Sequence, residues 1–266
     1  MKDFEIESLA DQILESYQQQ APVDLIYIAN QEGIELLEGD YGDDFHGRLE
    51  FLSDMGKFAL FHPRLATARF SGRIRFSIAH ELGHYFIEEH REGIIRGIFH
   101  NAEQGFISNN PIEREADKFA AALLIPNQLL RATTGRRGIL TLNQILSLAQ
   151  KCNASAQATA FRYVRFAEEP CLAIISKEGN ILYSFASDEA NARGFGLLGN
   201  RQVPPLSVTY KASQGNVQNI VEGETNTTLW FSERRGYEEL WEEAIPLGST
   251  FFVLTLLSWK DYTAED

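Results

Sequence analysis

The sequence predicts an α+β protein: a mostly helical first part containing a small antiparallel sheet, followed by a last part built mainly of antiparallel strands. Two observations indicate this class. Apolar residues recur at helical spacing in some stretches, whereas alternating runs bounded by turn residues occupy others. Composition agrees, because 266 residues with 44% hydrophobic and 23% charged side chains provide a core for one large domain or two smaller ones.

The chain should open with two helices, at residues 4–20 and 22–32, because Pro22 suits a helix start and Gly33 a helix end. Short alternating runs follow, separated by Tyr-Gly-Asp-Asp and Asp-Met-Gly, and they predict the strands of the small antiparallel sheet at 34–38, 46–52 and 57–61. The next helix is expected at 71–89.

This helix carries His80-Glu81-Leu82-Gly83-His84, an H-E-x-x-H quintet. Histidines four residues apart share one helical face, so both can bind a single zinc ion. Glu81 lies beside that face, where it could act as the general base for an attacking water. About 0.02 such matches are expected by chance in this composition. The alternative is that both histidines merely pack within a helix.

A catalytic zinc needs a third protein ligand and one open position. Residues 112–125 have helical periodicity, and Pro126 ends the pattern. Glu113 and Asp117 share a face of this helix, so they could serve as zinc ligand and as an outer carboxylate that orients a histidine. Glu115 points elsewhere and is the alternative ligand. All three acids could instead form a solvated face. The loop at 91–111 would overhang the site.

Two further helices are expected at 142–151 and 155–165, with Ser155 as a cap, and their tight connection resembles a helix-turn-helix. A helical hairpin that only packs on the core is the alternative. Glu168-Glu169-Pro170 marks a boundary, which gives three predicted regions: 1–126, 127–168 and 169–266. In the last region a hairpin and further strands are predicted at 171–176, 180–185, 206–210, 216–221, 227–231 and 250–259. Its core should contain Trp230, Trp241 and Trp259.

The net charge of −13 disfavours DNA binding by the whole molecule. Residues 127–167 are nevertheless locally cationic, with six basic residues and no acid: Arg131, Arg136, Arg137, Lys151, Arg162 and Arg165. No apolar stretch approaches the length of a membrane span, and no secretory signal is visible at the start. Cys152 and Cys171 are therefore expected to be free thiols in the cytoplasm, with a disulfide between them as the alternative.

Other residues near the quintet have simpler explanations. His90 lies ten residues past His80, on a different helical face, and like His100 is expected at the surface. Tyr85 should pack in the core. Gly83 costs helix stability, so we expect it to allow close approach of a neighbouring backbone.

Residues 73–84 (RIRFSIAHELGH) and 113–126 (EREADKFAAALLIP) resemble the two signature helices of the ImmA/IrrE family of bacterial metallopeptidases. The resemblance implies a zincin-like core in which His80, His84 and Glu113 hold zinc, with manganese as an alternative metal. It also implies that Glu81 is the general base and that Asp117 supports a ligand. A helix-turn-helix-like segment would follow, and the C-terminal part could be the GAF-like sensory domain of some members.

By the same resemblance, the protein would be a zinc endopeptidase that cleaves a helix-turn-helix transcriptional repressor during a bacterial stress or mobile-element response. The alternative is a regulator with a structural zinc that binds a repressor or DNA without cutting it. Loss of a salt-dependent DNA shift on changing Arg136 and Arg137 would favour that alternative.

Overall fold

The computed structural model describes residues 1–41, 47–63, 71–97, 110–134, 139–196, 201–214, 219–231, 236–248 and 251–259. The chain divides into two compact units. The first contains Met1–Asn127 and Gln150–Ser155, and the second contains Gln128–Ala149 and Ala156–Asp266. Most of the helical segment predicted at 127–168 is thus grouped with the C-terminal strands. The three-part division made from the sequence stays a prediction.

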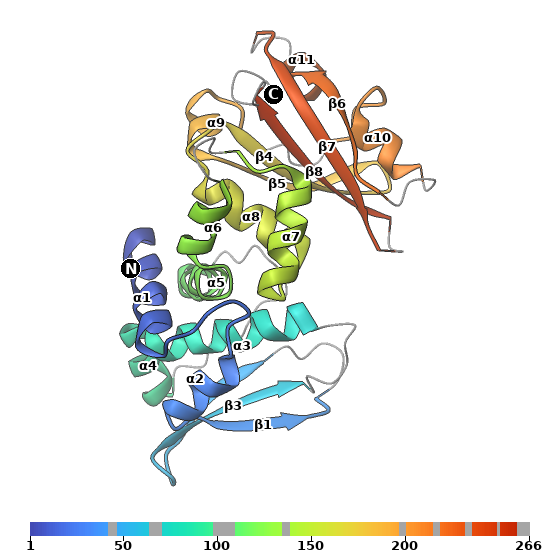
Figure 1. The fold of residues 1–266 in the computed structure, drawn as a ribbon. Coiled ribbons are helices and arrows are strands. Elements are labelled where there is room, and N and C mark those ends of the chain that lie inside the picture. The colour runs from blue at the N-terminus through green and yellow to red at the C-terminus, as the bar shows by residue number, and fades with distance from the viewer. Residues whose placement is uncertain are drawn as a thin grey trace. The chain divides into compact units, whose positions relative to one another are not determined.

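The described part of the first unit confirms the alternation of helices and a small sheet. Its helices are α1 (Asp3–Ser16), α2 (Leu25–Gln31), α3 (Ser71–Phe86), α4 (Glu88–Ile95) and α5 (Pro111–Leu124). Its strands are β1 (Glu35–Gly39), β2 (Arg48–Leu52) and β3 (Lys57–Pro63). Figure 1 shows α3 lying over this sheet.

The sheet of the first unit has the strand order β1-β3-β2. β2 pairs with β3 in antiparallel fashion, as expected for strands joined by a tight turn, but β1 pairs with β3 in parallel. The prediction of a wholly antiparallel sheet is therefore wrong. Alternation of apolar residues shows which face a strand buries and carries no information about strand direction.

Three predicted helix ends differ from the structure. α1 ends at Ser16, four residues before the predicted end. α2 begins at Leu25 because the side chain of Asp24, not Pro22, marks its start by accepting the N–H of Tyr27. The predicted helix at 71–89 is two helices, which meet at Ile87, the N-cap of α4. α4 continues to Ile95, within the predicted loop, and the loop's residues 98–109 lie outside the described residues.

The helices pack through apolar stripes. α1 buries Ile6, Ala10 and Leu14, which lie four residues apart on the face that contacts α5. α5 in turn packs against α3, where a Cβ atom built on Gly83 would lie 3.2 Å from the Cα and carbonyl oxygen of Ala116. The expected close approach at Gly83 is confirmed.

In the second unit and its junctions, the helices are α6 (Asn127–Thr134), α7 (Leu142–Cys152), α8 (Ala156–Phe166), α9 (Asp188–Ala192), α10 (Val208–Ser213) and α11 (Thr227–Trp230). The strands are β4 (Cys171–Lys177), β5 (Asn180–Ala186), β6 (Val221–Asn226), β7 (Glu239–Leu247) and β8 (Phe252–Trp259). They form one antiparallel sheet in the order β5-β4-β8-β7-β6, beside which α10 lies in Figure 1. The α+β class is confirmed.

Two predicted strands of this unit are helices instead. The stretch at 206–210 contains the start of α10, because Ser207 caps the N–H of Tyr210. The stretch at 227–231 is α11, capped by Asn226. β6 begins at Val221, the last residue of the strand predicted at 216–221, and residues 216–218 of that prediction lie outside the described residues. β7 was not predicted at all. The helices at 142–151 and 155–165, the hairpin of β4 and β5, and the last strand are confirmed within one or two residues.

The core of the second unit gathers large side chains from the sheet and α11. Trp230 and Trp259 are buried as expected, whereas Trp241 is only partly buried. Cys152 and Cys171 are buried free thiols, so the disulfide alternative is wrong. Within the described ranges, no helix is both long enough and apolar enough to cross a membrane.

Candidate metal centre

The candidate site lies in the first unit, where α3 and α5 face each other. α3 supplies His80 and His84 from successive turns. α5 starts with Asn110, whose side chain accepts the N–H of Ile112, followed by Pro111 at the first helical position. This start places Glu113 in the first turn, where the positive end of the helix dipole favours a carboxylate.

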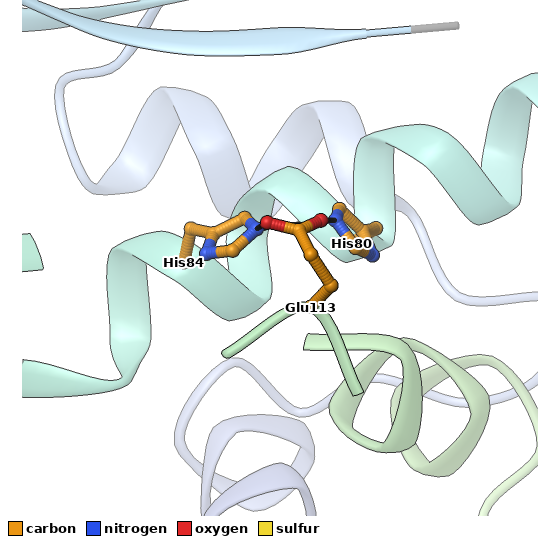
Figure 2. Close-up of side chains that lie close together, drawn as sticks. All are labelled: His80, His84 and Glu113. Carbon is orange, nitrogen blue, oxygen red and sulfur yellow. Dashed lines mark hydrogen bonds and ion pairs between the residues drawn. The ribbon is translucent and has the colours of Figure 1, made fainter. Parts of the chain in front are cut away.

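The ligating atoms of His80, His84 and Glu113 point at one another, as Figure 2 shows. The Nε2 atoms of the two histidines are 3.1 Å apart, and His80 Nε2 is 3.1 Å from Glu113 Oε2. His84 Nε2 is 3.7 Å from Glu113 Oε1. Ligands about 2.0–2.1 Å from a tetrahedral zinc ion would be about 3.3 Å apart, so these separations suit three corners of such a site.

The surroundings of these groups also fit a cation. All three side chains are buried, and Glu113 Oε1 has no hydrogen-bond partner within the described residues. Burial lowers the pKa of His84 to about 4, although Glu113 opposes this shift. Burial would raise the pKa of Glu113, but the hydrogen bond with His80 and the nearby ring of His84 outweigh it and hold that pKa far below its usual range. A neutral imidazole and an ionised carboxylate are the forms that bind a metal.

Asp117 lies directly behind His80. Its Oδ1 is 2.9 Å from His80 Nδ1, the ring nitrogen that does not face His84 and Glu113. Burial lowers the pKa of His80, but the hydrogen bonds with Asp117 and Glu113 outweigh this and raise it to about 10. Asp117 holds the proton on Nδ1, so Nε2 is the nitrogen that would bind a metal, which would take the place of the second proton.

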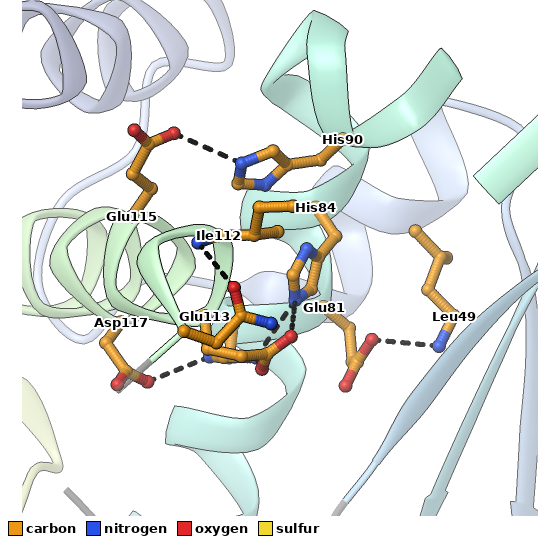
Figure 3. Close-up of polar contacts among 10 residues, drawn as sticks. Leu49, Glu81, His84, His90, Ile112, Glu113, Glu115 and Asp117 are labelled. Carbon is orange, nitrogen blue, oxygen red and sulfur yellow. Dashed lines mark hydrogen bonds and ion pairs between the residues drawn. The ribbon is translucent and has the colours of Figure 1, made fainter. Parts of the chain in front are cut away.

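Glu81 extends from α3 toward the sheet and is also buried. Its Oε2 accepts the backbone N–H of Leu49 in β2 at 2.8 Å, as Figure 3 shows. Gly47 lies close by, since a Cβ atom built there would be 3.3 Å from Glu81 Cγ. Burial raises the pKa of Glu81. This contact with Leu49 could not be found from the sequence, because it joins residues 32 positions apart.

Glu115, the alternative third ligand, points away from the other acids of α5. Its Oε2 is 3.1 Å from Nε2 of His90, and its other oxygen pairs with the amino group of Met1. His90 is only 2% exposed, so the prediction of a surface histidine is wrong. The error follows from the helix break at Ile87, which turns α4 and brings His90 back toward α3. His100 lies outside the described residues.

Tyr85 takes no part in the centre. Its hydroxyl donates to Glu32 at 2.9 Å, and its ring packs edge-on against Phe58 of β3. The expectation that Tyr85 packs in the protein interior thus agrees with its contacts, although the side chain is partly exposed.

The buried His80, His84 and Glu113 converge from two packed helices and could hold a metal ion, and the comparisons indicate a metallopeptidase-like domain. Residues 65–163 match the family model Peptidase_M78, described as the IrrE N-terminal-like domain. The chain thus carries this domain, and the predicted relationship to the ImmA/IrrE family is confirmed.

A solved structure titled "Mycobacterium tuberculosis transcriptional regulator" is similar to nearly the whole chain. The TM-score is 0.64, the sequence identity is 15%, and the similarity covers 97% of this chain and 77% of that one. At this identity the similarity shows the fold alone. A search of curated protein sequences gives no match.

Proposed function

We propose that this protein is a zinc-dependent endopeptidase that acts in the cytoplasm of a bacterium. His80, His84 and Glu113 would hold the zinc, with manganese as the alternative metal. The observation that carries the proposal is the convergence of these three ligating atoms beside the buried Glu81. Within the described residues no fourth His, Cys, Asp or Glu joins the group, which leaves one tetrahedral position for water or substrate.

Zinc in this position would act as a Lewis acid on a peptide carbonyl and would lower the pKa of water. Glu81 would then take the proton of the attacking water and pass it to the leaving amine. Two features of the chain suit this role. Burial raises the pKa of Glu81, which favours proton uptake, and the N–H of Leu49 holds one carboxylate oxygen while the other stays available.

The small sheet offers a way to bind the substrate. β2 is an edge strand in the order β1-β3-β2, and its Leu49 contacts Glu81 directly. An extended peptide that added to this edge by main-chain hydrogen bonds would pass close to the general base. We therefore propose a protein substrate that presents an extended segment, cut at a peptide bond within it.

For the identity of that substrate, we propose a helix-turn-helix transcriptional repressor, cleaved in a stress or mobile-element response. The ImmA/IrrE relationship supports this class, and the similar mycobacterial structure is titled a transcriptional regulator. Direct DNA binding is not part of the proposal. The net charge is −13, and of the basic residues in the cationic segment Arg162 is buried and Arg165 lies over the ring of Phe185.

The test compares newly formed protein N-termini by mass spectrometry in cells that produce wild type, Glu81→Gln or Glu89→Gln. Glu89 is an exposed acid of α4 and serves as the matched control. Wild type and Glu89→Gln should yield the same new N-terminus in one repressor, and Glu81→Gln should not. Zinc content of the purified proteins, measured in parallel, should be equal in all three.

Two results would contradict the proposal. An active Glu81→Gln enzyme would exclude the assigned general base. Identical N-terminal profiles for all three proteins under several stresses would favour the alternative, a zinc-containing regulator that binds its partner without cutting it.

A further inference from the structure

An acid of α5 supports each histidine of the metal centre. One acid contacts its histidine directly, and the other does so through a second imidazole. Asp117 contacts His80 directly at 2.9 Å. Behind His84 lies the ring of His90, with the two ring centroids 5.1 Å apart and the planes tilted by 45°. The acid Glu115 is 3.1 Å from the far side of His90, at Nε2, as Figure 3 shows.

We propose that His90 and Glu115 are positioning residues that hold the ring of His84 in its metal-binding orientation. This inference rests on the proposed function only in assuming that His84 binds a metal. The two residues come from helices on either side: His90 from α4 and Glu115 from α5. Together they lie along the ring of His84, with His90 in contact with that ring and Glu115 in contact with His90.

Packing and charge both support this role. His90 is 2% exposed, so removal of its imidazole would leave a cavity against His84 and let that ring turn. Its hydrogen bond with Glu115 then determines which way the ring of His90 faces. An ion pair between a buried His90 and a partly exposed Glu115 is weak evidence for stability, because a well-packed apolar pair often serves as well. The pairing of His90 with Glu115 is better explained by the fixed orientation that the hydrogen bond gives to the ring of His90.

The position of Glu115 on α5 fits the same explanation. Glu113 and Asp117 share a face of the helix because they are four residues apart, whereas Glu115 is about 200° around the axis from Glu113. That direction leads to α4, as the contact with His90 shows. A single helix thus supports both zinc-binding histidines, one directly and one through a second imidazole.

The test measures zinc affinity by competition with a chelating dye, together with the visible absorption bands of the Co²⁺-loaded protein. The variants are His90→Ala, His90→Gln and Glu115→Ala. Gln at position 90 keeps an N–H donor for Glu115 without the ring. Glu92→Ala is the matched control, since Glu92 is an exposed acid of α4 paired only with the exposed Arg96 in the contacts described.

We expect His90→Ala and Glu115→Ala to weaken zinc binding about tenfold and to shift the Co²⁺ bands, because loss of supporting contacts around a ligand costs about 10–100-fold in affinity. His90→Gln should recover part of the loss, and Glu92→Ala should match wild type. Wild-type affinity and spectra in both His90→Ala and Glu115→Ala would overturn the inference while leaving the metal site intact.

A wild-type protein that binds no zinc would instead defeat the proposed function, and this inference with it. Melting temperatures of the metal-free proteins identify any variant that has not folded. If His90→Ala is unfolded, Glu115→Ala decides alone, since Ala is a good helix former and Glu115 is partly exposed. Unchanged zinc affinity in that variant would then overturn the inference.

Discussion

Gly83 of α3 faces the backbone of Ala116 of α5, and a Cβ atom at position 83 would lie 3.2 Å from both the Cα and the carbonyl oxygen of Ala116. Gly83 immediately precedes His84, and Ala116 immediately precedes Asp117. A close contact between the two helices therefore lies within the candidate metal centre itself. The spacing between the histidines and Glu113 depends on this contact.

We expect Gly83→Ala to destabilise the first unit by about 1–3 kcal/mol, the usual cost of overpacking, despite the better helix propensity of Ala. The new Cβ atom would meet the backbone of Ala116, which cannot move aside as a flexible side chain could. Zinc affinity should fall as well, because the helices must separate. Gly72→Ala in the same helix is the control, since its Cβ atom would make only ordinary contacts of 3.4 Å or more. Chemical denaturation measures the free energy of unfolding of both variants. Equal values for Gly83→Ala and Gly72→Ala would contradict the predicted clash with Ala116.

Asp117→Asn should weaken zinc binding about 10–100-fold without unfolding the protein. Asn keeps the size and one acceptor oxygen, but it lacks the negative charge that strengthens the hydrogen bond with His80 Nδ1. Competition with a zinc chelator gives the dissociation constants. Lys118→Ala, a change at the neighbouring side chain that pairs with Asp3, should leave zinc affinity unchanged.

Metal removal should lower the melting temperature of the first unit. A ligand that binds only the folded state at a free concentration 100 times its dissociation constant adds about 2.7 kcal/mol to the free energy of unfolding. Scanning calorimetry with zinc and with a chelator measures the difference. His84→Ala should melt at the same temperature in both conditions, and a zinc-dependent shift in that variant would argue against His84 as a ligand.

The second unit should lose stability as pH rises from about 4.5 to about 7, because of Glu243. Burial raises the pKa of this carboxyl to about 7, although the N–H of Leu142, which it accepts at 3.0 Å, opposes the shift. The folded state therefore keeps a proton that the unfolded state has already released. Glu243→Gln, which can still accept that N–H, should remove a cost on the order of 3 kcal/mol above pH 7. Denaturation curves at pH 5 and pH 8 provide the measurement, and an equal pH dependence in both proteins would contradict this assignment.

The residues of the metal centre could be proposed from the sequence because their relation is local. Two histidines four apart on one helix, or Glu113 and Asp117 on another, must share a face wherever the helices lie. The structure brings these four side chains together. Local spacing also explains the wrong prediction for His90. Its direction was derived from one continuous helix, and the break at Ile87 changed that direction.

Other features depend on contacts that sequence spacing does not encode. The parallel pairing of β1 with β3 is one, since alternation is the same in either direction. β7 is another: it carries the adjacent acids Glu242 and Glu243, residue types that usually lie at the surface. Both are buried, with partners far along the chain: Thr209 for Glu242 and Leu142 for Glu243. The predicted strands at 206–210 and 227–231 contain Thr and Tyr, which are common in strands, but the side chains of Ser207 and Asn226 cap helices there.

The proposed third ligand, Glu113, lies only three residues after Asn110, the cap of α5. The ends of helices fray more readily than their interiors, so we expect this turn of α5 to open before the middle of the helix. The affinity for zinc would then include the free energy of closing that one turn. A partner or mutation that unwinds the start of α5 would release the metal while the two histidines remain in place on α3. A partner or mutation that holds this turn closed would tighten metal binding without contacting a ligand.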